Sequence, residues 1–183
     1  MKVIAIYAIE EEAIELSIPD AEMRSICSGV GKTHAAFRLA KAIGEERPDL
    51  VINYGTVGTL KHRVGDIVVC NRFIDRDIVT SKHRPTNELV STPIKGMAIF
   101  DEVKTYGTCN TGDRFVTKLT DIEGDVFDME AYSEALVCKE MGIPFVAVKY
   151  VTDIIGQNSV ALWEDKLSDA RKALMQFFKN QQP

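Results

Sequence analysis

Short runs of β-branched and apolar residues alternate along the chain with segments whose apolar positions recur about every 3.6 residues. This alternation favours strands joined by crossover helices over an all-β or all-α domain. The predicted strands are KVIAIYAI, MRSIC, LVINYG, DIVVCNRFI, VKTYGTC and IPFVAVKYV, which begin at Lys2, Met23, Leu50, Asp66, Val103 and Ile143. We therefore predict an α/β fold with at least six strands in a single domain, residues 1–183.

Three helices are predicted from apolar positions that fall on one helical face. The faces are formed by Ala36, Leu39, Ala40 and Ile43, by Ala131, Ala135, Cys138 and Met141, and by Leu167, Ala170, Leu174, Phe177 and Phe178. Gly142 and Pro144 end the second helix, because glycine suits the left-handed residue after a helix and proline cannot continue one. The segment 72–103 is rich in charge, Thr, Ser and Pro, and is predicted to hold loops and at most short strands.

Composition excludes several classes of function. The chain has 183 residues, 45% of them hydrophobic, and a net charge of −5, so it has no overall basic field to attract nucleic acid. The apolar start is cut short by three glutamates, which predicts no signal peptide, no membrane span and a cytoplasmic location. The four cysteines and three histidines show no ligand spacing, so we expect reduced thiols and neither a metal nor a cofactor.

Two glycine-containing stretches, SGVGKTHAAF and NYGTVGTL, follow predicted strands. In open α/β sheets the carboxyl ends of strands border the ligand crevice, where exposed N–H groups bind oxygens or anions. Neither stretch is a dinucleotide or P-loop motif. Tight strand-to-helix turns therefore explain them as well as a ligand site does.

Three acidic positions have both a structural and a chemical explanation. Glu10, Glu11 and Glu12 follow the first strand, where a helix dipole favours acids by roughly 0.3 to 1 kcal/mol. One of the three could instead face the crevice and take a proton from water. Glu130 lies in the first turn of a predicted helix and Asp153 at a turn after a strand. Taken singly, none of these acids identifies a site.

Six motifs in order carry a resemblance over nearly the whole chain: AIEEEA, SGVGKTHAA, DLVINYGTVGTL, VGDIVV, TGDRFV and DMEAYSEALVCKEMGIPFVAVKYVTD. Together they resemble the nucleoside phosphorylase superfamily, and within it the 5'-methylthioadenosine/S-adenosylhomocysteine nucleosidases. The resemblance implies a three-layer α/β/α sandwich around a mixed, partly barrel-like sheet. It also implies a homodimer that hydrolyses the N-glycosidic bond of an adenine nucleoside without cofactor or metal.

The resemblance assigns catalytic roles to two acids. Glu12 matches a base that activates the attacking water, and Asp153 matches the acid that protonates the purine. Such chemistry needs an ionised Glu12 and an Asp153 whose pKa is raised by desolvation, because negative charge develops on the leaving base and positive charge on the ribose.

Substrate-binding roles follow in the same way. Glu130 matches the carboxylate that binds the ribose hydroxyls, and Met129 packs against the sugar. Phe115 matches an aromatic that stacks on the base, and the backbone of Val116 meets the base edge. Thr56, beside Val57 and Gly58, matches a hydroxyl residue near the attacking water or, in phosphorylases, the phosphate. Thr152 matches a small hydroxyl residue that supports the acid.

The chain also departs from the family pattern. Residues 14–26 and 75–107 are shorter than in relatives, which leaves the accepted 5' substituent open. Lys82, His83 and Arg84 form either a solvated loop or a contact to a charged 5' group. Lys149 replaces a more usual arginine, and Ile154, Ile155 and Gly156 replace small and acidic residues.

Three functions remain on sequence grounds. Hydrolysis leads, because the glutamate triplet stands where phosphorylases tend to carry a loop with Gly and Arg. A phosphorylase would use Thr56, loop N–H groups and Arg84 to hold phosphate. An inactive nucleoside-binding relative need not keep Glu12 and Asp153.

Overall fold

The structure is a computed structural model, and it describes residues 1–78, 88–91, 100, 103–118, 123–157 and 159–180. Its strands are β1 (Lys2–Tyr7), β2 (Glu22–Cys27), β3 (Leu50–Thr59), β4 (Ile67–Asp75), β5 (Glu88–Val90), β6 (Gly107–Thr111), β7 (Val126–Asp128) and β8 (Phe145–Ile154). Its helices are the 3-10 turn η1 (Glu10–Glu12), α1 (Lys32–Glu45), α3 (Ala131–Met141) and α4 (Ser159–Asn180).

The eight strands form one mixed sheet with the order β2-β1-β3-β7-β6-β4-β5. Strand β8 lies off this path and pairs in parallel with β3 and antiparallel with β4. Strands β3, β7, β6, β4 and β8 therefore close into a ring, while β1 and β2 extend from β3 and β5 extends from β4. This arrangement confirms the predicted mixed, partly barrel-like sheet.

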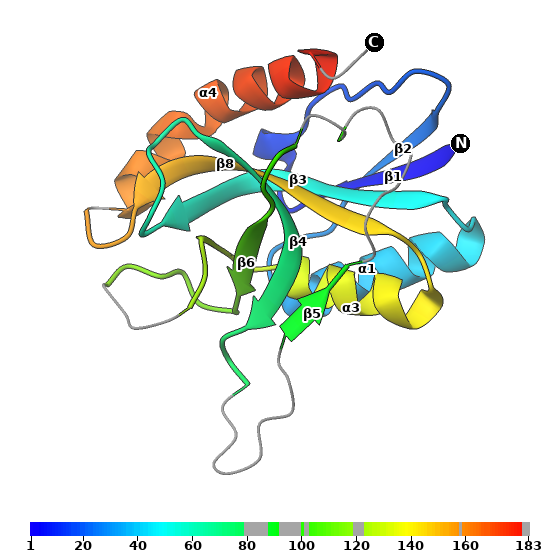
Figure 1. The fold of residues 1–183 in the computed structure, drawn as a ribbon, viewed down its shortest axis with the longest axis horizontal. Coiled ribbons are helices and arrows are strands. Elements are labelled where there is room, and N and C mark those ends of the chain that lie inside the picture. Colours follow the sequence, from blue (N-terminus) through cyan, green and yellow to red (C-terminus); the bar gives the residue numbers. More distant parts are fainter. Residues whose placement is uncertain (79–87, 92–99, 101–102, 119–122, 158, 181–183) are drawn as a thin grey trace.

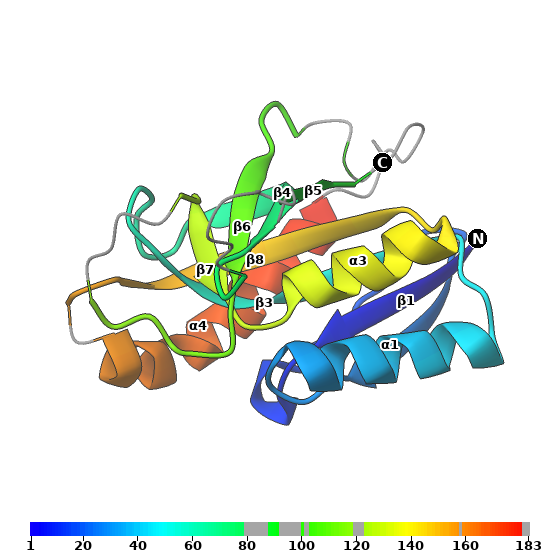
Figure 2. The same cartoon turned by 90° about the horizontal axis from the view of Figure 1, so that it is seen from below.

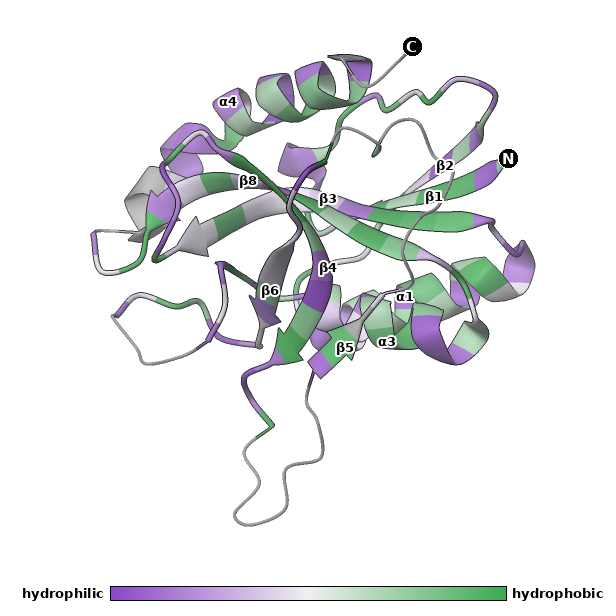
Figure 3. Ribbon diagram, viewed as in Figure 1, coloured by the Kyte–Doolittle hydropathy of each residue, from purple (hydrophilic) through white to green (hydrophobic). Residues whose placement is uncertain are grey.

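Helices cover the sheet on both faces. In Figure 1, α4 lies on one side of the strands and α1 with α3 on the other, and Figure 2 shows α1 and α3 side by side. Alternate residues of β1 enter different cores, because successive side chains of a strand point to opposite faces. Ile4 and Ile6 pack with the α1 and α3 side, and Val3 and Ala5 with the α4 side. Strand β1 and the first half of β3 are mostly apolar in Figure 3, as strands buried on both faces require, whereas β4 and β6 carry polar stretches.

Two strand predictions need correction. The stretch NYGTVGTL is not a turn, since Gly55 and Gly58 lie inside β3, which runs on to Thr59. The strand predicted from Val103 begins only at Gly107, because pairing with β4 starts there and the N–H of Val103 bonds instead to the carbonyl of Phe100. Strand β7 was not predicted at all.

Within the described ranges, no helix has the length and apolar character needed to cross a membrane.

Candidate active site

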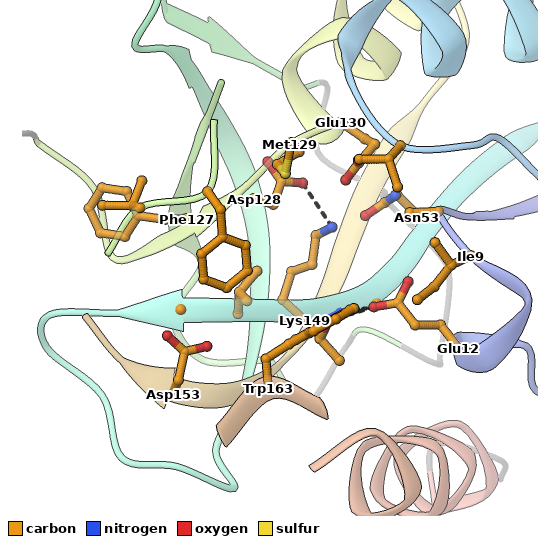
Figure 4. A pocket seen from close by; sticks show the side chains of 18 of the residues that line it. Ile9, Glu12, Asn53, Phe127, Asp128, Met129, Glu130, Lys149, Asp153 and Trp163 are labelled. Atoms are coloured by element: carbon orange, nitrogen blue, oxygen red, sulfur yellow. Dashed lines mark hydrogen bonds and ion pairs between the residues drawn. The ribbon is translucent and has the colours of Figure 1, made fainter. Parts of the chain in front are cut away.

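A cavity of about 350 Å³ opens at the carboxyl ends of the strands, bordered by η1, β3, β8 and the segments that follow β6 and β7. It brings together all but one of the predicted site residues: Glu12, Thr56, Val57, Gly58, Phe115, Val116, Met129, Glu130 and Asp153. In Figure 4, Glu12 and Asp153 lie on opposite sides of this cavity. Thr152 does not line the cavity, but its hydroxyl lies beside Asp153.

Glu12 is the member of the glutamate triplet that faces inward. Glu10 and Glu11 are exposed, whereas Glu12 is buried at the end of η1. Its Oε1 accepts hydrogen bonds from the Thr56 N–H at 2.8 Å and from the Thr56 hydroxyl at 2.5 Å. Burial raises the pKa of Glu12, and the bonds from Thr56 and the charge of Lys149 oppose that rise. A carboxylate held in this way is oriented to accept a proton from water.

A β-bulge directs Asp153 into the cavity. The parallel register of β3 and β8 passes from Val57↔Val151 directly to Gly58↔Asp153, so Thr152 is the extra residue. Bulges re-aim side chains in this way and are common next to active sites. The Thr152 hydroxyl lies 2.8 Å from Asp153 Oδ1 and 3.2 Å from the Val57 carbonyl oxygen. Thr152 therefore fixes the carboxyl group of Asp153 from behind.

The glycines of β3 make room for the two acids. A Cβ atom on Gly58 would lie 3.0 Å from Asp153 Oδ2, and one on Gly55 would lie 3.1 Å from Glu12 Oε2. Both distances are shorter than ordinary contacts between heavy atoms. The glycines of NYGTVGTL therefore do border a cavity, but they do so because acidic side chains pack closely against a strand there, and not because the chain turns.

Glu130 joins the cavity to the start of α1. It is the N-cap residue of α3, rather than a member of its first turn, and its Oε1 accepts the Gly31 N–H at 2.8 Å. Burial raises the pKa of Glu130 to about 7, and the negative charge of Asp128 adds to this, while Lys149 and the Gly31 N–H oppose it. The pKa of this carboxyl group is thus shifted from the acidic range toward neutrality in the free protein.

A buried ion pair lies beneath Glu130. Lys149 Nζ is 2.9 Å from Asp128 Oδ2, and both side chains are almost fully buried. Asp128 also accepts hydrogen bonds from the Thr111 hydroxyl at 2.6 Å and the Ala131 N–H at 2.9 Å. Burial opposes ionisation of Asp128, but Lys149 and these bonds hold its pKa below its ordinary value. The sequence signal for this pair was a lysine inside an otherwise apolar strand.

Residues 15–180 match the family model of the phosphorylase superfamily. The chain belongs to this superfamily. The 5'-methylthioadenosine/S-adenosylhomocysteine nucleosidase of Geobacillus thermodenitrificans is 29% identical over 170 residues, covering 79% of this chain and 72% of the relative. The corresponding enzyme of Bacillus velezensis is 26% identical over 215 residues, covering 93% of each chain. The family predicted from the motifs is confirmed.

Solved structures share the fold over the whole chain. A mutant of the Helicobacter pylori nucleosidase, with 5'-methylthioadenosine in its active site, superposes with a TM-score of 0.84 at 18% identity, covering 98% of this chain and 97% of that one. The futalosine hydrolase of the same organism has a TM-score of 0.84 at 19% identity and covers 98% and 96%. The predicted nucleoside phosphorylase-like fold is thereby confirmed.

Several further residues line the cavity but were not predicted from the sequence. One is Trp163, whose indole Nε1 donates to Thr56 Oγ1 at 2.9 Å. Another is Phe127, which is buried, whereas the predicted aromatic residue Phe115 is 41% exposed. Figure 4 also labels Asn53, Ile9 and the ion pair of Asp128 and Lys149, which line the cavity and were not predicted as site residues. Only Trp163 carries a distinctive signal, since the chain has a single tryptophan.

Arg76 links the two predicted binding segments. Its guanidinium donates to the carbonyl oxygens of Gly112 at 2.9 Å and Arg114 at 2.7 Å, in the segment that carries Phe115 and Val116. It also donates to the Asp128 carbonyl at 3.0 Å, next to Met129 and Glu130. The residues matched to base and ribose binding are therefore tied together by one side chain.

Some sequence predictions fall outside these observations. Lys82, His83 and Arg84 lie outside the described residues. Among the residues that the structure describes, no three His, Cys, Asp or Glu side chains are grouped so as to hold a metal ion.

The pKa of Glu130 predicts a pH-dependent stability. The folded protein keeps this proton up to about pH 7, whereas the unfolded chain releases it near its ordinary value of 4.5. Stability from the neutral form is therefore fully present below pH 4.5 and is lost as pH rises through 7. We expect Glu130→Gln, which stays neutral, to gain up to about 3 kcal/mol relative to the wild type between pH 5 and 8. Urea unfolding at both pH values measures this, with Glu11→Gln as the exposed control. If the difference in unfolding free energy between Glu130→Gln and the wild type were the same at both pH values, Glu130 would not be the group that titrates.

Proposed function

We propose that this chain is a nucleosidase that hydrolyses the N-glycosidic bond of an adenine nucleoside of the 5'-methylthioadenosine/S-adenosylhomocysteine type. The observation that carries the proposal is the Glu12 carboxylate held by Thr56 in the same cavity as Asp153. The activities named for the relatives support the same reaction and substrate class.

The chemistry divides between the two acids. As the C1'–N9 bond breaks, the oxygen of water bonds to C1' and Glu12 takes a proton from that water. Asp153 donates a proton to N7 of the leaving purine, so the two transfers balance over the reaction. Glu130 accepts hydrogen bonds from the ribose hydroxyls and places negative charge near the ribose ring, where an oxocarbenium-like charge develops.

The contacts of Thr56 favour water over phosphate as the nucleophile. In the runner-up reaction, the Thr56 N–H and hydroxyl would bind phosphate, but both donate to Glu12. A phosphate there would meet a carboxylate in a poorly solvated site, and like charges repel strongly at short range.

The start of α1 offers no alternative anion site of the same kind. The N–H groups of Gly31 and Lys32 are bonded to the carboxylates of Glu130 and Asp113, each at 2.8 Å. These two N–H groups, which point out of the start of the helix, are therefore bonded to acids of the chain. These contacts support hydrolysis over phosphorolysis.

An inactive nucleoside-binding protein is the third candidate. Such a protein needs a pocket but not a buried base and acid on its opposite sides. Burying carboxylates costs stability, so their presence together with Thr152 as a support for Asp153 favours catalysis.

A homodimer and a cytoplasmic location stay predictions. The exposed apolar side chains of Phe37 on α1 and of Leu136 and Met141 on α3 support self-association, because these two helices pack side by side. Sedimentation equilibrium would contradict the dimer if it returned the monomer mass of 20.4 kDa at micromolar concentration.

The hydrolase proposal predicts turnover without phosphate. Purified protein in phosphate-free buffer should release adenine from 5'-methylthioadenosine, S-adenosylhomocysteine or a nucleoside with another 5' group. The sugar product should be the free pentose rather than its 1-phosphate, which chromatography with mass detection distinguishes. Strict dependence on added phosphate would promote the phosphorylase reading.

The proposed base can be tested against its exposed neighbour. Glu12→Gln keeps the shape of the side chain but cannot accept the proton of water, so kcat should fall by roughly 10² to 10⁴-fold. Glu11→Gln is the matched control and should keep the wild-type rate, because Glu11 is exposed and lies outside the cavity. Equal rates for the two variants would return Glu12 to a structural role.

The proposed acid can be tested through the leaving group. Asp153→Asn cannot deliver a proton, so we expect a loss on the order of 10²-fold with an adenine nucleoside. With a ribosyl 4-nitrophenyl ether the loss should be much smaller, because that phenolate leaves without protonation. The same loss on both substrates would mean that Asp153 shapes the pocket or positions the sugar.

A further inference from the structure

The single tryptophan of the chain makes a directional contact to the candidate base. Trp163 projects from α4 into the cavity, and its Nε1–H donates to Thr56 Oγ1 at 2.9 Å. Thr56 Oγ1 in turn lies 2.5 Å from Glu12 Oε1. Three side chains from α4, β3 and η1 thus form one chain of hydrogen bonds, part of which is visible in Figure 4.

Chemistry fixes the direction of this chain. An indole N–H can only donate, and a hydroxyl has one proton. With its oxygen accepting from Trp163, the Thr56 hydroxyl is left to direct its own proton to Glu12. Both donors of Thr56 then fall on Oε1, which orients the carboxylate and leaves Oε2 as the oxygen that Thr56 does not bind.

We propose that Trp163 is a positioning residue for Glu12 that acts through the Thr56 hydroxyl. The proposal rests on the proposed role of Glu12 as the base. Without the indole donor, the hydroxyl of Thr56 could rotate toward water or substrate, and the carboxylate would lose its strongest orienting bond for part of the time.

A second contact from α4 points to the same role. Arg171, two turns beyond Trp163, donates to the carbonyl oxygen of Glu11 at 2.7 Å, inside η1. Helix α4 therefore holds both the hydroxyl that binds Glu12 and the turn that carries it. The carboxyl-terminal helix is in this way a structural part of the site, although its sequence has the amphipathic spacing of an ordinary surface helix.

Simple packing is the competing explanation for Trp163. Its ring lies 6.4 Å from that of Phe115 in an edge-on arrangement, a contact that any aromatic side chain could make. Trp163→Phe separates the two roles, because phenylalanine keeps an aromatic ring beside Phe115 but has no N–H. A packing role survives this change and a positioning role does not.

The first experiment needs no substrate. A protein with one tryptophan gives one indole N–H resonance, whose exchange with solvent reports the bond to Thr56. We expect exchange at least about tenfold faster in Thr56→Val, which lacks the hydroxyl, and unchanged in the control Thr56→Ser, which keeps it. Equal exchange in the wild type and Thr56→Val overturns the proposal, whether or not the chain cleaves a nucleoside.

The second experiment is a double-mutant cycle on turnover. Trp163→Phe should lower kcat about tenfold with KM changed less than threefold, and the same change in Thr56→Val should cost less than twofold. The cycle supports positioning only if the two losses are coupled. Equal losses in both backgrounds, or a change in KM alone, overturn it in favour of packing. A wild type that cleaves no nucleoside defeats the proposed function instead, and the exchange measurement then decides whether Trp163 orients Thr56.

Discussion

Burial of negative charge around one cavity is the constraint on which the rest of the structure depends. An ionised carboxylate removed from water costs several kcal/mol unless other groups compensate it. This chain buries four carboxyl groups that line the cavity, Glu12, Asp128, Glu130 and Asp153, and a further one, Glu134, on α3. Each has to be hydrogen-bonded, paired or kept protonated.

The compensating groups come from distant parts of the chain. Glu12 depends on Thr56, Glu130 on the Gly31 N–H, and Asp128 on Lys149. None of these contacts is local in sequence. The cost of burying the acids is therefore offset only once the strands and helices have packed together. Glu134 differs, since neither of its carboxyl oxygens has a hydrogen-bond partner among the described residues. Burial raises the pKa of Glu134 well above its usual range, and the charge of Lys149 and the nearby Asn53 oppose that rise.

The sequence predicted what depends on local pattern. The helices and most strands follow from apolar spacing, and the end of α3 follows from Gly142, which adopts the left-handed conformation. All but one of the site residues that the motif order predicted line the cavity, although they are fewer than half of its lining residues. These successes rest on signals within a few residues or on resemblance to a family.

The failures share a different cause. Whether a glycine such as Gly58 turns the chain or admits a neighbour depends on Asp153, nearly a hundred residues away. The bulge at Thr152 is a property of the register between two strands and leaves no mark in either. Trp163 was not singled out in the sequence, because its hydrogen-bond partner lies in another element. Local sequence patterns predict which residues are buried. They do not predict which distant residues those side chains contact.

The pKa of Glu130 near 7 connects this constraint to catalysis by the proposed route. An ionised carboxylate attracts the positive charge that develops on the ribose but meets no such charge in the neutral substrate. With a pKa near 7, Glu130 is ionised more readily once that positive charge develops beside it. Its interaction therefore strengthens as the C1'–N9 bond breaks, and only such a difference between ground state and transition state raises the rate.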